Sequence, residues 1–551
     1  MRPAGRGPLE SLYFNYPQFD PPPRDNTRVA RQRVVIAGAG PVGQLAALAL
    51  ASHGIESVLL EEKATFNDGS RAICVARQSF HILEQVGVVQ ACLDKALGWT
   101  TGRNLYRGTQ IFEFSMPHSQ DDKYLPMYNL QQQYLEQFLW EAIERNPRID
   151  MRWQSPVKAV ADCAEGVRVT VAHPDGDYTI EADWLLAADG ARSPIRAMRG
   201  LRLKGENYQG TYVIADVRME HPYPTIRRAL FDPAANRGAT VLIHRQPENI
   251  WRVDYQIGSG ESIEGATAET VVRERVSAIL EEIGHRGPWE LEWWSAYSAN
   301  TLALDDYRDG RVFFLGDSAH IVPIFGVRGL NNGLADAANI AWKLAMVLKN
   351  EAGERLLDSY TPERRGATLD VFLNATKSTR FMTPPSVGWR LVRDATLSLA
   401  LRHEFAGAFS NPRQMAPHSY SDSPATLPDA AAGAGGSPPG TVLANVRLDD
   451  GRYLSDLLGP GFSGVWCASA ASHLTRIELQ SLLEKVDPRL RLLEVGVDFT
   501  DTSRRVAIRL GMPHGGFYLV RPDLHVAGRW FNVHAESIAA ALAAILDRAG
   551  G

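Results

Sequence analysis

Three closely spaced glycines are the first residues of this chain whose pattern suggests chemistry. Gly38, Gly40 and Gly43 follow the apolar stretch RVVIA, which predicts a buried strand, and they open QLAALALASHG, which predicts a helix. In such a turn the first glycine permits a tight bend, the second lets the backbone approach a pyrophosphate, and the third lets helix and strand pack closely. The helix N-terminus adds free N–H groups and a partial positive charge. The spacing therefore predicts a dinucleotide site.

Glu61 completes this prediction. It closes a second apolar strand, SVLLEE, 23 residues after Gly38, near the spacing of about 20 that such sites use. Its carboxylate can accept hydrogen bonds from ribose hydroxyls. Because it would also repel a 2′-phosphate, NADP is disfavoured at this position.

Two further segments make the pattern specific. They are LLAADGARSPIR, at 185–196, and GRVFFLGDSAHIVPIFGVRGLNNGLADAANIAWKL, at 310–344. In this order after the glycine turn, they resemble the group A flavoprotein aromatic hydroxylases, the single-component FAD monooxygenases of the p-hydroxybenzoate and phenol hydroxylase type. The total length and the C-terminal region are most similar to the 3-(3-hydroxyphenyl)propionate hydroxylase branch.

The resemblance implies roles for individual residues. The three glycines would hold the FAD pyrophosphate, and Glu61 would bind the adenosine ribose. Gln132 would lie near the ribityl chain, with Gln131 or Gln133 as the alternative match. The remaining implied cofactor residues are Arg71, Asp189, Gly190, Gly316, Asp317, Gly329, Leu330 and Asn331. The residues placed nearest the reacting ring are Pro323, Gly326 and Arg328.

The chemistry of these residue types agrees with the implied roles. A carboxylate after a buried strand makes charge-assisted hydrogen bonds to hydroxyls. A glycine-rich turn before a helix presents N–H groups that stabilise developing negative charge. Val327 and Arg328 depart from the glycine and glutamine common in the family. Arg328 could reach the flavin or a substrate carboxylate, but a position in solvent is favoured. For His320 a structural hydrogen bond is expected, and for Trp293, Trp294 and Tyr297 core packing is favoured over stacking on a substrate.

The predicted fold class is α/β plus β, with a discontinuous scaffold. Residues 31–200 and 301–414 alternate apolar strands with helical spacing, which predicts a Rossmann-like FAD-binding domain, of the GR2 type by resemblance. Residues 201–300 are rich in β-branched and aromatic residues and predict an inserted β-sheet domain that binds the substrate.

The two ends of the chain have different compositions. Residues 1–30 carry prolines and charges and predict a disordered lead-in without a secretory signal. Residues 415–440 are rich in Ala, Gly, Pro and Ser and predict a linker. Residues 441–551 predict a compact domain, thioredoxin-like by resemblance but without a redox cysteine pair.

Composition excludes several classes of function. The formal net charge of −5 over 551 residues gives no electrostatic reason to bind nucleic acid. No apolar run is long enough to span a membrane. The four cysteines form no CxxC pair, so neither a metal site nor dithiol chemistry is expected. A cytoplasmic enzyme is the default prediction, and a homodimer is a candidate assembly.

The resemblance implies a flavoprotein monooxygenase. It would take electrons from NADH or NADPH, use O₂, and hydroxylate a small phenolic substrate similar to a 3-hydroxyphenyl alkanoate through a flavin C4a-hydroperoxide. Two alternatives stay open: a hydroxylase of polycyclic polyketide phenols, and a non-hydroxylating protein that binds FAD or another ligand. Disulfide reductases are excluded by the cysteines, and flavin halogenases by the missing WxWxIP segment.

Overall fold

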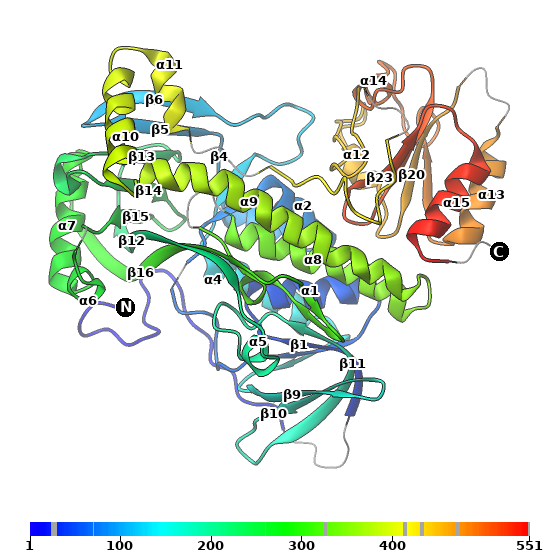
Figure 1. Ribbon diagram of the computed structural model, residues 1–551, viewed down its shortest axis with the longest axis horizontal. Coiled ribbons are helices and arrows are strands. Elements are labelled where there is room, and N and C mark those ends of the chain that lie inside the picture. Colours follow the sequence, from blue (N-terminus) through cyan, green and yellow to red (C-terminus); the bar gives the residue numbers. More distant parts are fainter. Residues whose placement is uncertain are drawn as a thin grey trace.

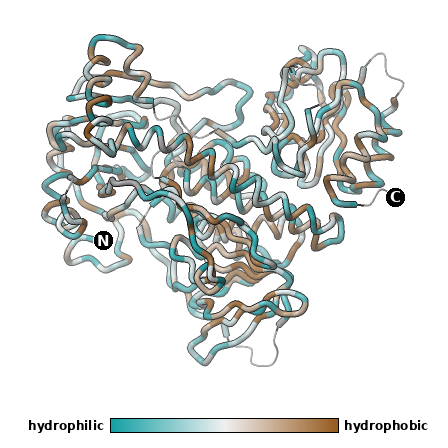
Figure 2. Tube along the Cα trace, in the orientation of Figure 1, coloured by the Kyte–Doolittle hydropathy of each residue, from teal (hydrophilic) through white to brown (hydrophobic). Residues whose placement is uncertain are grey.

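The computed structural model describes residues 1–23, 30–69, 71–258, 260–323, 328–411, 416–429, 433, 435–469 and 474–548 (Figure 1). Two large sheets lie on either side of a central layer of long helices, and a smaller sheet-based domain follows at the C-terminal end. Apolar colouring in Figure 2 concentrates along the central helices and the strands that they cover.

The first sheet contains the glycine turn. Its strands run in the order β17 (Arg308–Asp309), β18 (Val312–Phe314), β11 (Tyr178–Ala187), β1 (Ala30–Ala37), β2 (Ser57–Leu60) and β8 (Ile149–Arg152), with β9 (Val157–Cys163) and β10 (Gly166–Val171) attached through β11. The strands from β18 to β8 are parallel. Such strands are buried on both faces, which explains the unbroken apolar runs that predicted them.

Several helices pack against this sheet around the glycine turn. The main ones are α1 (Pro41–Ser52), α2 (Arg77–Gln85), α4 (Gln132–Glu144) and α8 (Gly329–Leu348), and α1 packs between α4 and α8. Helix α8 begins at Gly329, directly after the glycine-rich segment. The long α9 (Tyr360–Met382) lies along α8 and reaches the second sheet (Figure 1).

The second sheet is antiparallel apart from one pair of strands. Its order is β19 (His320–Ile321), β16 (Trp289–Ala303), β12 (Lys204–Met219), β15 (Ile250–Gln256), β14 (Thr240–Arg245), β13 (Arg227–Phe231), β5 (Thr101–Tyr106) and β6 (Thr109–Ser115). Helices α6 (Ile263–Ala266) and α7 (Glu269–Glu282) belong to its outer side. The insert was expected to comprise residues 201–300 alone. The structure adds β5 and β6, which the sequence had placed in the FAD-binding domain, because β5 pairs with β13.

Short elements connect the two sheets. A small sheet of β3 (Cys74–Ala76), β7 (Met127–Asn129) and β4 (Leu97–Trp99) lies between them. Helices α3 (Val89–Lys95) and α5 (Pro194–Met198) flank the first sheet. After α9, helices α10 (Val387–Ala400) and α11 (Glu404–Gly407) pack over the β6 end of the second sheet.

The C-terminal domain has a mixed sheet in the order β21 (Arg491–Glu494), β20 (Ser463–Cys467), β22 (Gly516–Val520) and β23 (Val526–Trp530). Its helices are α12 (Leu454–Leu457), α13 (Arg476–Val486), α14 (Arg505–Arg509) and α15 (Ala535–Ile545). Trp342 and Met346 of α8 join Phe462 and Trp466 of this domain in one apolar cluster. Buried ions reinforce the contact, because Glu363 of α9 accepts two hydrogen bonds from Arg521, at 2.7 and 2.8 Å.

Two segments expected to be loose are packed. Residues 1–23 form no helix or strand, but Phe14 is buried and Arg2 pairs with Glu292 of β16, which differs from the expected disordered lead-in. In the expected linker, Tyr420 stacks on His525 with ring centroids 4.1 Å apart. These contacts depend on partners more than 100 residues away, which composition does not reveal. No helix in the described part of the chain is long and apolar enough to cross a membrane.

Candidate active site

Four predicted motifs meet at one edge of the first sheet. Ala37, Leu60, Ala187 and Phe314 lie beside one another in register at the carboxyl ends of β1, β2, β11 and β18. The glycine turn, Glu61, the 188–190 segment and the 316–317 segment each follow one of these strands. The carboxyl edge of a parallel sheet is where open α/β folds bind ligands.

The three glycines have distinct structural requirements. Gly38 has φ +97°, and an added Cβ would overlap the backbone of Ala188. A Cβ at Gly43 would overlap the carbonyl oxygen of Gly38. Gly40 is different: its φ of −67° suits any residue, and the nearest atom to an added Cβ is Asn67 Nδ2 at 3.7 Å. The protein itself does not require glycine at position 40, whereas a close ligand would.

Glu61 supports the glycine turn directly. Its Oε2 accepts a hydrogen bond from the Ala39 N–H at 2.7 Å, and its Oε1 accepts one from the Lys63 N–H at 3.1 Å. Burial raises the pKa of Glu61, and these two N–H groups oppose the rise. The carboxylate therefore lies at the turn, where the sequence placed it for a ribose.

Asp189 and Gly190 form the next corner of the site. Asp189 Oδ2 accepts the Ile195 N–H at 3.0 Å, while Oδ1 is buried and accepts no hydrogen bond from the described residues. Burial raises the pKa of Asp189. Gly190 has φ +78°, and no atom lies within 4 Å of an added Cβ. A buried carboxylate oxygen without a donor is costly and points to a missing polar partner.

Asp317 retains an exposed side chain between the buried residues Gly316 and Ser318. Desolvation by the surrounding protein nevertheless raises its pKa, and the charges of Arg71 and Arg196 act against this rise. The carboxylate is therefore closely surrounded by protein and yet accessible. It is available to bind a hydroxyl.

The segment before α8 holds the remaining predicted residues. Pro323 is buried, and Gly329 and Leu330 are partly accessible in the first turn of α8. Asn331 Oδ1 accepts the Ala76 N–H at 2.8 Å, and its Nδ2 donates to the Cys74 carbonyl at 3.1 Å. The start of α8 is thereby fastened to β3. Gly326 and Val327 lie outside the described residues.

Arg328 was expected in solvent, and this expectation is wrong. Its side chain is buried, and Nη1 donates to the Val371 carbonyl of α9 at 3.1 Å. Burial lowers the pKa of Arg328. The contact depends on α9 packing beside α8, which sequence spacing does not show.

Gln132 is the best placed of the three candidate glutamines. Gln131 and Gln133 are buried and donate to the Pro247 carbonyl and the Tyr16 hydroxyl. Gln132 keeps accessible surface and accepts the Ala72 N–H at 3.4 Å, next to the exposed Arg71.

The other side chains behave mainly as expected. Trp294 is buried and its Nε1 donates to the Thr267 carbonyl, so it is a core residue. Tyr297 extends toward the site instead, since its hydroxyl donates to the Val322 carbonyl at 2.9 Å. His320 Nε2 lies 2.7 Å from Asp336 Oδ2, which is the expected structural hydrogen bond.

Two supporting residues were not singled out from the sequence. Asp336 accepts the Gly316 N–H at 2.9 Å, and Arg196 donates to the Ser318 carbonyl at 2.9 Å. Both lie within the quoted motifs, so their position was the available signal. They hold the 316–318 turn from two sides.

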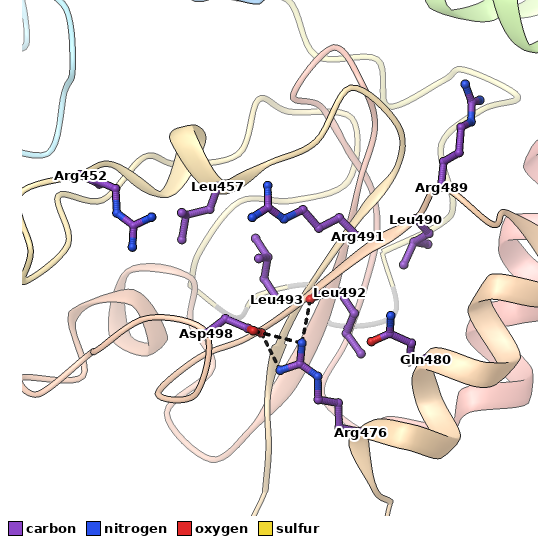
Figure 3. Close-up of a pocket in the computed structure, with 10 residues that line it drawn as sticks. All are labelled: Arg452, Leu457, Arg476, Gln480, Arg489, Leu490, Arg491, Leu492, Leu493 and Asp498. Atoms are coloured by element: carbon purple, nitrogen blue, oxygen red, sulfur yellow. Dashed lines mark hydrogen bonds and ion pairs between the residues drawn. The ribbon is translucent and has the colours of Figure 1, made fainter. Parts of the chain in front are cut away.

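An open hollow of about 410 Å³ lies elsewhere, on the C-terminal domain (Figure 3). It is lined only by residues between 452 and 498, including Arg452, Arg476, Arg489 and Arg491. Ion pairs with carboxylates occupy three of these arginines, as with Arg476 and Asp498. No residue of the four motifs lines it, so it is separate from the candidate active site.

Comparison with known proteins identifies the family. Residues 31–374, more than half of the chain, match the family described as FAD binding domain. The chain belongs to this family. The expected FAD cofactor is thereby confirmed.

The individual relatives described next are each less than 30% identical to this chain in sequence. A 3-(3-hydroxy-phenyl)propionate/3-hydroxycinnamic acid hydroxylase of Klebsiella pneumoniae (strain 342) is 29% identical over 364 residues, which cover 66% of this chain and 64% of that protein. A 6-methylpretetramide 4-monooxygenase of Streptomyces rimosus is 26% identical over 539 residues, or 93% of each chain. The crystal structure of the flavin-dependent monooxygenase PieE with FAD and substrate shares the fold, with a TM-score of 0.79 and 21% identity over 94% of this chain and 99% of that one.

The residues of this FAD-binding chain fit the cofactor. Gly40 leaves room for a close ligand, Asp189 offers an unpaired buried oxygen, and Asp317 is an accessible carboxylate. In the described residues there is no group of His, Cys, Asp and Glu that could hold a metal ion.

Proposed function

We propose that this flavoprotein is a monooxygenase that uses NADH or NADPH and O₂ to hydroxylate a phenolic ring. The observation that carries the proposal is the convergence of four motifs at the carboxyl ends of β1, β2, β11 and β18. Named relatives support an aromatic substrate, since they include a hydroxylase of 3-(3-hydroxyphenyl)propionate and a para-nitrophenol 4-monooxygenase. A 3-hydroxyphenyl alkanoate is the favoured substrate class.

A polycyclic phenol is the second candidate. The relative that acts on 6-methylpretetramide aligns over 93% of both chains, including the C-terminal domain. Relatives named for small phenols are 29% identical to this chain where they align, compared with 26% for the relative named for 6-methylpretetramide, and this favours the smaller substrate.

The chain's own residues divide the work. FAD, when bound, supplies oxygen activation after reduction by the nicotinamide nucleotide. Gly38, Gly40 and the N-terminus of α1 would hold its pyrophosphate. Glu61 would accept ribose hydroxyls, and Asp317 would accept those of the ribityl chain. The N–H groups from Gly329 onward, at the positive end of α8, would stabilise negative charge at the flavin ring.

The finer domain assignments remain proposals. They are a GR2-type FAD-binding domain at 31–200 and 301–414, a substrate domain at 201–300 extended by β5 and β6, a linker at 415–440, and a thioredoxin-like domain at 441–551. The mixed order β21-β20-β22-β23 supports the last of these. Burial raises the pKa of Cys467 to about 12, which disfavours thiolate chemistry there.

A homodimer and a cytoplasmic location are also proposed. Eight large apolar side chains between residues 387 and 409 are each more than 40% exposed, including Val387, Leu391 and Phe405. They belong to α10, α11 and their flanks at the edge of the molecule (Figures 1 and 2). Clusters of exposed apolar side chains are typical of interaction surfaces, where each partner of a standard interface buries roughly 800 Å². A second copy related by a two-fold axis would cover this cluster.

Rapid-mixing kinetics test the proposed function. The purified yellow protein is mixed with NADH or NADPH, with and without phenols, and flavin bleaching is followed. We expect a substrate to accelerate bleaching and then to gain one oxygen atom from isotope-labelled O₂. Peroxide as the only product with every phenol would refute the proposal.

A further inference from the structure

Three buried polar residues share one face of the second sheet. We call Arg227, His244 and Asp254 the polar cluster. Asp254 pairs with Leu242 across β15 and β14, and Leu242 pairs with Ala229 of β13. Because side chains alternate along a strand, Arg227 and His244, each two residues from these positions, point to the same face as Asp254. Each member is 5% exposed.

Asp254 is a buried carboxylate that lacks a partner. No hydrogen bond or ion pair joins it to the described residues, and its Oδ1 is fully enclosed. Burial raises its pKa to about 7, although the nearby charges of Arg252 and Arg227 oppose the rise. Buried carboxylates are normally paired or hydrogen-bonded, so this site is missing a donor.

Arg227 is the complementary case. Its nearest polar contact among the described residues is the Met382 sulfur at 4.0 Å, and no carboxylate there lies within ion-pair distance. Burial lowers its pKa to about 10. His244 adds an Nδ1 without a hydrogen-bond partner, and burial lowers its pKa to about 3, so the ring is neutral at pH 7. The cluster therefore holds one cation that no carboxylate of the described residues pairs with directly.

The neighbouring residues Arg252 and Asp216 form a buried ion pair that the polar cluster lacks. Arg252 bonds both oxygens of Asp216 at 2.8 Å and also the Arg71 carbonyl at 2.9 Å. Both oxygens of Asp216 are bonded to Arg252, so Asp216 cannot neutralise the charge of Arg227. The unsatisfied groups are Asp254 on β15 and Arg227 on β13; these strands are separated by β14, so their backbones run about 10 Å apart, and Arg227 lies two residues along the sheet from the position opposite Asp254.

The polar cluster borders the candidate active site. The charges of Arg227 and Asp254 act on the Cys74 thiol of β3. The same residue's carbonyl accepts Asn331 Nδ2 at the start of α8. On another side, Thr240 of the same sheet donates to the Met382 carbonyl at the end of α9. The cluster is therefore enclosed between strand β3, which is bonded to the start of α8, and the end of α9.

We propose that the polar cluster is a two-point substrate subsite, in which Asp254 accepts the phenolic hydroxyl and Arg227 binds an acidic group on the same molecule. This inference rests on the proposed hydroxylase function and deepens it. It assigns the substrate class as a phenol with an anionic side chain, because an unpaired proton acceptor and an unpaired cation on one face of the sheet suit a molecule that carries both a hydroxyl and an acidic group.

The chemical step is a proton transfer. The substrate O–H bond breaks, its proton forms a new O–H bond on the Asp254 carboxylate, and the electron pair stays on the phenolate oxygen. The electron-rich ring then reacts more readily with an electrophilic oxygen. A general base works best when its pKa lies near the working pH. The titratable groups facing Asp254 are Arg252, Asp216, Arg227, His244, Cys74 and Tyr212.

Ligand binding to the FAD-loaded protein tests the subsite. Three probes are titrated, with flavin absorbance and calorimetry as readouts: 3-(3-hydroxyphenyl)propionate, the neutral 3-propylphenol, and 3-phenylpropionate, which lacks the hydroxyl.

Arg227→Met should raise the Kd of both acids at least tenfold and that of 3-propylphenol less than about threefold. Arg227→Lys should restore part of the loss. In the wild type, the Kd of the two phenols should rise as the pH falls below about 7, and Asp254→Asn should remove that dependence.

Arg228→Met is the matched control. Arg228 is the next residue of β13, on the opposite face, where it lies 3.0 Å from the Tyr223 ring centroid. FAD content and melting temperature are measured for every variant, and Arg227→Gln replaces Arg227→Met if the latter fails to load FAD. Equal effects of the substitutions at 227 and 228, or a pH dependence that persists in Asp254→Asn, would overturn the subsite. If the wild type hydroxylates phenols while these patterns fail, only this inference falls; if it hydroxylates none, the proposed function falls with it.

Discussion

Replacing Gly40 by alanine separates the needs of the protein from those of the cofactor. The backbone at Gly40 is extended, with φ −67° and ψ 178°, and no protein atom lies closer than 3.7 Å to the added Cβ. Alanine is a poorer N-cap than glycine, but it also reduces the entropy of the unfolded chain. These effects oppose each other, so the unfolding free energy of the apoprotein should change by less than about 1 kcal/mol.

The cost should appear in FAD binding. The Cβ would occupy the space through which the backbone approaches the pyrophosphate, which displaces at least one hydrogen bond to a charged oxygen. Such a bond contributes about 1.5–3 kcal/mol, which corresponds to a roughly 10- to 150-fold higher Kd. At an FAD concentration of about 100 times the wild-type Kd, the cofactor stabilises the wild type by about 2.7 kcal/mol. A 100-fold weaker variant would gain only about 0.4 kcal/mol.

Melting curves with and without FAD, together with a fluorescence titration of FAD, measure both quantities. Gly43→Ala serves as the comparison, because its Cβ would overlap the Gly38 carbonyl oxygen and should destabilise the apoprotein itself by about 1–3 kcal/mol. If Gly40→Ala binds FAD as tightly as the wild type, the pyrophosphate does not approach this turn and the reasoning is refuted.

Three further perturbations have distinct signatures. Glu363→Gln removes a buried carboxylate that accepts hydrogen bonds from two cations, so the free energy of unfolding measured in urea should fall by about 3–5 kcal/mol. Glu354→Gln, in a half-exposed ion pair, should lower it by less than about 1 kcal/mol, and equal losses would contradict the burial argument. Burial acts to raise the pKa of Asp336, but a neighbouring arginine and histidine hold it below its ordinary value. The stabilising contribution of the carboxylate is therefore complete above about pH 4 and is lost as the pH falls through the folded-state pKa. The difference in unfolding free energy between the wild type and Asp336→Asn should narrow in acid, and a difference that stays constant would contradict this reasoning. Leu391→Glu should convert the proposed dimer to a monomer in light scattering, while Ile477→Glu, on the C-terminal domain, should leave it intact; a wild type that is already monomeric would contradict the proposed dimer.

The cofactor motifs were predictable because they are local. A strand, a glycine turn and a helix start within a few residues of one another, and parallel strands bring their carboxyl ends to one edge. Glycine 38 carries its own signal, since its positive φ and the overlap of a Cβ with Ala188 both demand that residue. The order of the motifs along the chain was therefore enough to predict where they meet.

Features that depend on distant partners were missed. Strand β5 joins the second sheet through β13, more than 120 residues later, and neither strand's composition shows the pairing. Arg328 looked solvent-exposed because its partner is a backbone carbonyl, at Val371, that any sequence could supply. The polar cluster was invisible for the same reason: Asp254 stood out in no motif, and only its burial without a partner distinguishes it.

The shared cluster between α8 and the C-terminal domain has a consequence for biosynthesis. Trp342 and Met346 become buried against Phe462 and Trp466 only when residues made more than 100 positions later are present. During translation the FAD-binding part emerges first, with an apolar helix face and the Glu363 carboxylate still uncovered. Nascent chains of this kind are prone to aggregate. The time between synthesis of α8 and docking of the last domain is thus the stage at which the chain is most open to aggregation.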